Sequence, residues 1–373
     1  DLFADVTFDV TDAFQIGGGI RYSRDDKRTG YTASVQNGRS ILGGFIGALS
    51  QSGATRTALL NALAVPGAAN IPQSALYPVP MFGLGLQPTA GNGNLAEQSN
   101  DSGGFTWRAT ARYALSPQAS VYANYARGRR PEVLGVSPPA APGGAARFNL
   151  LPAETVDSFE LGLKTELMDR TLFFDGAAFY YDYSNFQTTE QVGTSFVTVN
   201  AGKAESYGFE GQMRWNPADW INLFATYAYN HSRFKAGARK GNQFRLSPDH
   251  SASAGMTLRG DVGPVAIDFT PDVTWQSRVF FDDDNDIARL QTGNLIPDTV
   301  QDEVQGAFAT VNARIGIETA NGRWRIEGFV TNLFDKDYIK DAGNTGDGLG
   351  MPTFIAGEPR MWGASLTLRL GGK

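Results

Sequence analysis

Residues 322–370 read GRWRIEGFVTNLFDKDYIKDAGNTGDGLGMPTFIAGEPRMWGASLTLRL, and this stretch decides the fold. Its last part places an apolar side chain at every second position, with small or polar residues between, in the series Trp362, Ala364, Leu366, Leu368 and Leu370. A period of two residues is that of a β-strand, whose successive side chains point to opposite faces. Residues 324–331 alternate in the same way. The stretch therefore predicts two strands that are joined by a long polar connection.

The same alternation recurs along the whole chain. We count about 13 strands, in which short turns alternate with long connections. The long connections are expected near residues 26–103, 128–153, 184–199, 234–248, 279–305 and 338–357. This order is typical of an outer-membrane barrel, which has short turns on one side and long extracellular loops on the other. The sequence therefore predicts an all-β fold, an antiparallel transmembrane β-barrel.

The polar faces of these strands favour a barrel over a soluble β-sandwich. Full charges recur on them strand after strand, which suits a wide, water-filled lumen. A soluble sandwich is the alternative, but its loops would not sort by length so regularly. One strand departs from the pattern, because Pro271 falls in its middle and removes a ladder donor. We expect a bulge or a register shift there.

Composition argues against several other classes. The 373 residues include no cysteine, which removes disulfides, thiol catalysis and cysteine-based metal sites. The net charge of -6 argues against a nucleic-acid groove, which would carry a basic stripe. No apolar run approaches the roughly 18 residues of a spanning helix, whereas barrel strands need only about 9 to 11 residues each.

No motif in the sequence supports catalysis. His231 and His250 flank one connection and could meet, yet they lack a third ligand in a recognisable pattern. The sequence contains neither a nucleophile elbow nor a phosphate-binding glycine loop. We therefore predict a protein that is not an enzyme.

Four segments carry a resemblance to a known family: LPAETVDSFELGLKTEL (151–167), VNAGKAESYGFEGQ (199–212), TNLFDKDY (331–338) and GEPRMWGASLTLRL (357–370). In this order and spacing, the chain resembles the C-terminal part of the barrel of a TonB-dependent outer-membrane receptor. The resemblance implies a 22-stranded barrel with an N-terminal plug inside it. Residues 1–373 would then supply about the last 13 strands, and the plug and the early strands would be missing.

The resemblance also implies a function in the bacterial outer membrane. Proteins of this family take up a scarce, bulky solute, most often a ferric siderophore, with energy from the inner-membrane TonB complex. That complex would act through the missing N-terminal region, while the barrel would contact outer-membrane lipid and lipopolysaccharide. Two alternatives stay open: a passive porin-like channel, and a surface component used for adhesion or as a scaffold in a larger assembly. A porin would conduct ions, and a scaffold would bind a protein partner without conduction or uptake.

Three arginines are the first candidates for binding an anionic chelate. Arg127, Arg129 and Arg130 lie together in YARGRRPE, at the outer end of an expected strand. Guanidinium groups match carboxylate and catecholate oxygens in geometry and charge. The alternative is a solvated or lipopolysaccharide-facing basic rim. Further charged side chains on the expected lumen face complete the candidate set: Arg108, Arg112, Arg214, Asp268, Asp272 and Arg314.

The segment FDDDND, residues 281–286, is a candidate calcium site in an outer loop. Asp282, Asp284 and Asp286 stand at alternate positions, and carboxylate oxygens are ligands that calcium prefers. The segment lacks the glycine and the glutamate that an EF-hand loop carries at its sixth and twelfth positions. A plain acidic loop is the alternative. We expect no other cofactor.

Overall fold

Thirteen antiparallel strands form one curved sheet in the computed structural model, which describes residues 1–34, 52–62, 89–137, 139, 144–192, 195–291, 300–343 and 351–370. Each strand of the sheet is hydrogen-bonded to the next one along the chain. The strands are β1 (Leu2–Asp9), β2 (Phe14–Tyr31), β3 (Ala96–Ser116), β4 (Ala119–Arg130), β7 (Glu154–Leu167), β8 (Leu172–Ser184), β11 (Ala204–Ala218), β12 (Ile221–Phe234), β13 (His250–Val262), β14 (Val265–Gln276), β17 (Phe308–Thr319), β18 (Trp324–Thr331) and β21 (Met361–Leu368). The prediction of about 13 strands is confirmed.

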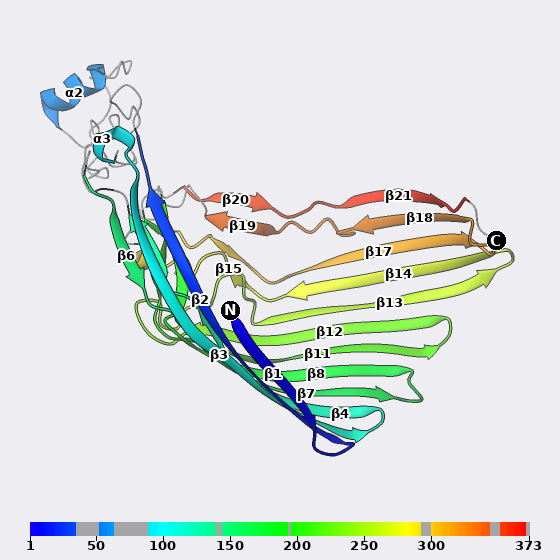
Figure 1. Cartoon of the computed structure of the whole chain (residues 1–373). Helices are drawn as coiled ribbons and strands as arrows, with labels where there is room; N and C mark the ends of the chain where they lie inside the picture. The colour runs from blue at the N-terminus through cyan, green and yellow to red at the C-terminus, as the bar shows by residue number, and fades with distance from the viewer. Residues whose placement is uncertain are drawn as a thin grey trace.

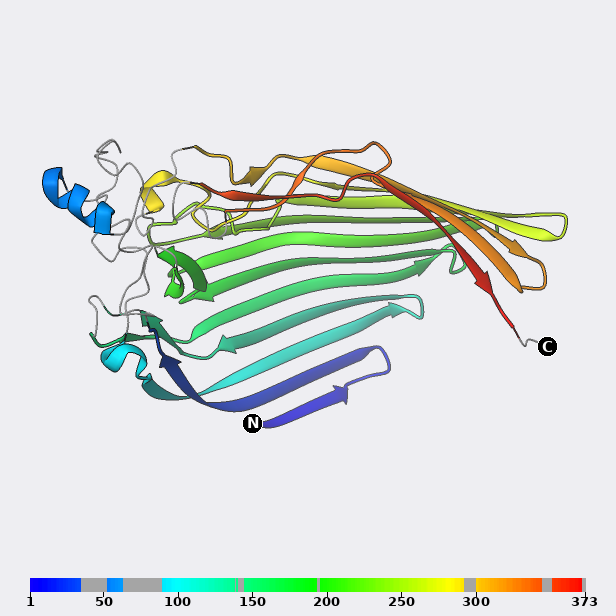
Figure 2. The same cartoon turned by 90° about the horizontal axis from the view of Figure 1, so that it is seen from above.

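The sheet is open, and β1 and β21 are its two edges. It curves from β1 round to β21, as Figures 1 and 2 show. Short turns lie at one end, and we call this the turn end. The long connections lie at the other end, the outer end, where α2 (Gly53–Ala62) and α3 (Ala90–Gly93) are also found (Figure 1). Within the described part of the chain, the helices are too short or too polar to cross a membrane.

The outer connections contain small hairpins that the sequence did not predict. They are β5 (Val133–Ser137) with β6 (Arg147–Leu151), β9 (Gln187–Val192) with β10 (Ser195–Asn200), β15 (Val279–Phe280) with β16 (Val304–Gln305), and β19 (Ile339–Gly343) with β20 (Thr353–Ala356). The expected connection at 26–103 is also too wide, because β2 and β3 continue pairing as far as Tyr31 and Ala96. Apolar alternation is lost in these extensions, while the backbone ladder continues.

The strand register separates an apolar face from a polar face. On the apolar face Tyr125, Phe159 and Tyr180 are neighbours on β4, β7 and β8, with ring centroids 5.0 and 6.5 Å apart. Phe159 is 48% exposed. The intervening positions, such as Glu160, carry the polar groups of the other face. This division is what a barrel wall between lipid and a wet lumen requires.

Pro271 does not produce the expected bulge or register shift, so that prediction is wrong. The pairs Gly255↔Asp272 and Leu258↔Phe269 share one register, although the β13–β14 ladder is interrupted between them. On the other side, β14 pairs with β17 without a break. The hydroxyl groups of Thr257 and Thr270 form a hydrogen bond of 3.0 Å across the interruption. The lost proline donor is therefore tolerated without an extra residue.

The outer connections have a small apolar core of their own. Phe234 is 1% exposed and packs with Ala201 and Ala204, and Phe186 and Phe244 lie against the same cluster. The ring centroids of Phe234 and Phe244 are 5.0 Å apart. This packing gives the connections fixed positions above the sheet.

Replacing Phe234 by alanine should loosen the outer connections. A buried Phe→Ala change costs about 3–5 kcal/mol because it removes apolar contacts and leaves a cavity. We expect new protease cleavage within the connections of the intact protein. The matched control is Phe209→Ala, because Phe209 is 50% exposed on the apolar face. Equal protease resistance of the two variants would contradict this packing.

Candidate functional site

A cavity of about 600 Å³ lies among four segments at the outer end. Its described lining comes from β9, from residues 239–246, from residues 281–291 with Glu303, and from the β19–β20 hairpin. This volume is within the range of about 300–1,000 Å³ that is usual for ligand pockets. Nine charged residues contribute to its described lining: the acids Glu190, Asp282, Asp283, Asp284, Glu303 and Asp341, and the bases Arg239, Arg245 and Lys340.

Side-chain hydrogen bonds to the backbone hold the cavity wall together. The side-chain amide of Asn285 forms two hydrogen bonds with the backbone of Gln243. It accepts one of 2.7 Å from the Gln243 N–H and donates one of 2.8 Å to the Gln243 carbonyl oxygen. Asn242 donates to the carbonyl oxygens of Asp283 and Asp284. Asn285 adopts φ 56°, a left-handed conformation that asparagine tolerates better than most residues. These bonds dock the acidic segment onto the connection between β12 and β13.

The carboxyl groups of the acidic segment are bound mainly by protein groups. Asp283 accepts a hydrogen bond from the Arg245 N–H at 3.0 Å and another from the Thr188 hydroxyl. Asp286 accepts from the N–H groups of Asp302 and Glu303 at 2.6 and 3.0 Å. In the described part of the chain, no group of three or more potential ligands has the geometry to hold a metal ion. The calcium hypothesis for Asp282, Asp284 and Asp286 therefore stays a prediction without support from this geometry.

Burial raises the pKa of two acids that line the cavity. The pKa of Asp282 is raised to about 7, first by desolvation and then by its neighbour Glu303. The pKa of Asp284 is raised to about 8 by desolvation and by the charge of Asp282, to which it is hydrogen-bonded. Two adjacent carboxyl groups away from water do not both ionise readily. The cavity therefore gains negative charge as the pH rises through this range.

These shifts predict that the outer connections become less stable as the pH rises. The folded pKa values exceed the usual value of 3.8, so the folded state binds more protons than the unfolded state between about pH 4 and pH 8. The stability that these two protonated acids contribute is fully present below about pH 4 and is lost as the pH rises through their folded pKa values. The melting midpoint of the intact protein should therefore fall as the pH rises from about 4 to about 8 and level off above that range. Each kcal/mol of stability lost should lower the midpoint by roughly 2–4 °C.

The variant Asp284→Asn tests this pH dependence, because its amide does not titrate. Its melting midpoint should change less with pH than that of the parent protein. Asp101→Asn, at the outer end of β3 and outside the cavity, is the control and should retain the full change. Parallel pH curves for all three proteins would argue against titration in the acidic segment.

The three predicted arginines do not form one cluster. Arg127 shares the apolar face with Trp107, Tyr125 and Asp157: its guanidinium lies 5.5 Å from the Trp107 ring centroid and 2.6 Å from the Asp157 carboxylate. Arg130 lies on the opposite face by alternation and donates to the Gln187 carbonyl at 3.0 Å. Strand alternation thus separates Arg127 from Arg130.

Arg129 is held by nearby protein groups. Its side chain is 9% exposed, and it pairs with Glu132 and Ser102. The Asp25 carboxylate lies 4.0 Å away. An arginine so enclosed has few donors left for a ligand. No arginine of the three lines the outer cavity.

The other predicted residues lie along the polar face of the sheet. Arg108 forms an ion pair of 2.8 Å with Asp5. Arg214 lies over the Phe173 ring, 4.7 Å from its centroid, and Arg112 pairs in register with Gln15 and Tyr122. Their placement on the expected lumen face agrees with the alternation of the sequence, but they are spread over several strands.

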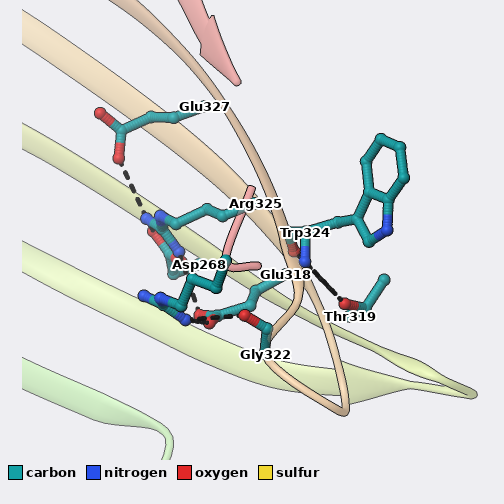
Figure 3. Close-up of polar contacts among 8 residues, drawn as sticks. Asp268, Glu318, Thr319, Gly322, Trp324, Arg325 and Glu327 are labelled. Atoms are coloured by element: carbon teal, nitrogen blue, oxygen red, sulfur yellow. Dashed lines mark hydrogen bonds and ion pairs between the residues drawn. The ribbon is translucent and has the colours of Figure 1, made fainter. Parts of the chain in front are cut away.

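Asp268 and Arg314 belong to a charged network near the turn end. Figure 3 shows its members Asp268, Glu318, Arg325 and Glu327. Arg325 of β18 binds Asp268 of β14 at 2.6 Å and Glu327 at 3.0 Å, and Arg314 binds Glu327 at 3.2 Å. Glu318 extends the network to Arg325 at 3.8 Å. These groups connect three neighbouring strands, and each charge lies beside a charge of opposite sign.

Asp272 is held separately from this network. It accepts a hydrogen bond of 2.7 Å from the side-chain amide of Asn312 on β17. The two histidines are engaged by aromatic residues: His250 is hydrogen-bonded to the Tyr227 hydroxyl at 2.8 Å, and the His231 ring lies against Tyr207. The histidines are therefore parts of the aromatic layer of the sheet.

Sequence reasoning missed the basic residues of the cavity. Arg239 pairs with Glu190 of β9 at 3.2 Å, and Lys340 pairs with Glu358 at 3.5 Å. They belong to connections far apart in the sequence, so no local spacing links them. The one signal in the sequence was the acidic segment 281–286, whose residues form part of this lining.

A family model described as "TonB dependent receptor-like, beta-barrel" matches residues 1–333. The pesticin receptor of Yersinia pestis is 24% identical over 340 residues, which make up 90% of this chain and 39% of that protein. The ferrioxamine receptor of Yersinia enterocolitica is 26% identical over 148 residues, 39% of this chain and 19% of that protein. The chain thus spans about two fifths of the length of the pesticin receptor.

Solved structures share the fold. The ferric yersiniabactin uptake receptor FyuA from Yersinia pestis has a TM-score of 0.68 at 20% identity, covering 98% of this chain and 44% of that one. The closed form of the ferric-catecholate import receptor Fiu from E. coli has a TM-score of 0.61 at 19% identity, with 98% and 43% covered. In both cases almost all of this chain superimposes on less than half of a larger protein.

Proposed function

Because this chain belongs to the TonB-dependent receptor β-barrel family, we propose that it forms one wall of a receptor that takes up a ferric siderophore across the bacterial outer membrane. Uptake would be driven by the TonB complex of the inner membrane. The names of its relatives support this choice: one similar structure is a ferric yersiniabactin uptake receptor, and another imports ferric catecholates. The proposal includes no catalytic step.

The outer cavity is the observation that carries the proposal. Its volume of about 600 Å³ suits part of a bulky chelate, and every segment around it belongs to the outer connections. A solute from the medium meets these connections first in an outer-membrane barrel. The polar face of the sheet would then line the route below the cavity.

The receptor needs parts that lie outside these 373 residues. Further strands would pair with β1 and β21 and close the barrel, as 22 strands would, and a plug would fill it. The TonB complex would engage the region of the polypeptide that carries the plug. Lipid and lipopolysaccharide would cover the apolar face. The position of Arg127 on that face supports the alternative role of a lipopolysaccharide-facing rim for this residue.

Uptake of radioactive iron tests this function. Cells that produce the intact protein should accumulate iron from its ferric siderophore, and accumulation should fall to the level of cells without the protein when TonB is inactivated. Uptake that continues without TonB would indicate a porin-like channel. Absence of uptake of every ferric chelate, together with binding of a protein partner, would indicate an adhesion or scaffold component. Either result would overturn the proposal.

A further inference from the structure

Most charged groups of the outer cavity are already engaged by protein groups. Glu190 pairs with Arg239 at 3.2 Å, and Lys340 pairs with Glu358 at 3.5 Å. Asp283 accepts hydrogen bonds from a backbone N–H group and from a hydroxyl group. A charged ligand group would have to displace an existing partner from each of these side chains.

The remaining acids of the described lining also offer little free charge near neutral pH. Burial raises the pKa of Asp282 to about 7 and that of Asp284 to about 8, and Glu303 is hydrogen-bonded to Asp282. Asp341 accepts a hydrogen bond of 3.0 Å from the next backbone N–H group. Arg245 forms no ion pair within the described part of the chain, but it is exposed, so water solvates its charge. The cavity is therefore poorly equipped to select a ligand by charge.

Apolar side chains of the same lining stay uncovered. Leu246, in the connection between β12 and β13, is 57% exposed, and Ile355 on β20 is 50% exposed. Leu290, in the connection between β14 and β17, lines the cavity with them. The fold thus brings apolar groups from three connections to one cavity. Their transfer from water to an apolar partner is favourable.

Leu246 has a backbone conformation that leucine seldom adopts. Its φ of 53° lies in the left-handed region, where glycine, asparagine and aspartate are at less of a disadvantage than leucine. Its N–H donates to the Phe280 carbonyl oxygen at 2.8 Å, and the preceding N–H donates to the Asp283 carboxylate at 3.0 Å. These bonds fix the backbone and leave the leucine side chain exposed on the cavity wall. Folding alone would be served better by another residue at this position.

We propose that Leu246 and Ile355 bind an uncharged, apolar part of the ferric chelate, so that the receptor selects its substrate by apolar contact and not by charge pairing. The inference rests on the proposed uptake of a ferric siderophore and names its substrate class. A strained residue that exposes an apolar side chain in a ligand-sized cavity is explained by this role, because binding covers the side chain.

Three forms of one chelate test the inference. The probe is a linear ferric trihydroxamate whose terminal amine is acylated with an acetyl, a benzoyl or a 4-carboxybenzoyl group. The last two groups have nearly the same shape and differ in charge. The intact receptor is titrated with each form, and binding is followed by tryptophan fluorescence. We expect the benzoyl form to bind about tenfold more tightly than the acetyl form, because small apolar groups in a hydrophobic pocket change affinity by about 10–200-fold. The 4-carboxybenzoyl form should bind more weakly than the benzoyl form.

The variant Leu246→Asn separates a ligand contact from a structural role. Asparagine tolerates the left-handed conformation better than leucine, so the variant should melt no lower than the parent protein. Its preference for the benzoyl form over the acetyl form should nevertheless shrink several-fold. A lowered melting midpoint with an unchanged preference would assign Leu246 a structural role only and would overturn the inference.

Two further variants assign the preference to the cavity. Ile355→Thr keeps a β-branched residue in β20 and should also reduce the preference. Leu150→Asn is the control, because Leu150 on β6 is 50% exposed and does not line the cavity. It should retain the full preference. Equal losses in all three variants would place the selectivity outside this cavity and contradict the inference.

The outcomes for the inference and for the proposed function are distinct. Equal binding of the three forms, or no binding of the benzoyl form, would overturn the apolar selectivity and mean that another part of the receptor covers Leu246 and Ile355. Tightest binding of the 4-carboxybenzoyl form would also overturn it, in favour of pairing with Arg245. Each of these results is compatible with TonB-dependent uptake of another ferric chelate. Failure of the proposed function would appear instead as the absence of TonB-dependent uptake for every ferric chelate.

Discussion

Residues 1–373 produced alone will fail to insert stably into a bilayer. The sheet has two edges, β1 and β21, and each edge strand has a partner on one side only. In hydrocarbon each unsatisfied backbone group costs several kcal/mol, which is why spanning sheets close into barrels. Refolding into lipid vesicles should therefore yield no heat-modifiable band on electrophoresis and no trypsin-protected core.

The complete polypeptide is the positive control for this experiment. Refolded under the same conditions, it should give a heat-modifiable and protease-resistant barrel, because its additional strands would pair with both edges. A protected, heat-modifiable species formed by residues 1–373 alone would mean that β1 and β21 can meet or that two copies complete each other. That result would contradict the proposed arrangement of the barrel.

Gly208→Val will prevent β11 and β12 from pairing as they do. A Cβ added at Gly208 would lie 1.8 Å from the carbonyl oxygen of Tyr229, a backbone atom that cannot move without disturbing the ladder. It would also lie 3.1 Å from the Phe179 ring. Overpacking in a close-packed region costs about 1–3 kcal/mol, occasionally more. We expect Gly208→Val to cost about 3 kcal/mol, the upper end of this range, so that most of the folded barrel is lost from the membrane.

Gly260→Val is the matched control, because Gly260 lies in β13 of the same sheet and has no atom within 4 Å of an added Cβ. Valine is favourable in strands, so this variant should assemble like the parent protein. The amount of heat-modifiable barrel in outer membranes measures both variants. Normal assembly of Gly208→Val would show that the strands separate more easily than the backbone distances indicate.

The sheet could be predicted from the sequence because its two faces meet different solvents. Alternation in residues 324–331 and 362–370 follows directly from that difference, and the same pattern revealed the other strands. The hairpins β9–β10 and β19–β20 escaped detection because the outer connections have no lipid-facing side. Strand pairing in these hairpins depends on backbone hydrogen bonds and turn geometry, which do not require apolar residues to alternate with polar ones. The same reason explains why β2 and β3 extend beyond their expected ends.

The candidate site was harder to predict than the fold. The alternation of faces along β4 could have separated Arg127 from Arg130. Arg127 is on the same face of the strand as Tyr125, and Arg130 is on the opposite face. The cavity could not be found in this way, because its walls are brought together by Asn242 and Asn285 across two connections. Such long-range side-chain bonds carry no periodic signal.

The intact mass of the protein extracted from outer membranes, with peptide mapping upstream of Asp1, tests the central claim most directly. A receptor barrel completed around this sheet predicts a mass well above that of 373 residues, together with peptides from a plug and from earlier strands in the same polypeptide. A mass equal to that of 373 residues, from a protein that is folded in the membrane, would contradict the account. It would mean that the thirteen strands close on themselves or with a partner.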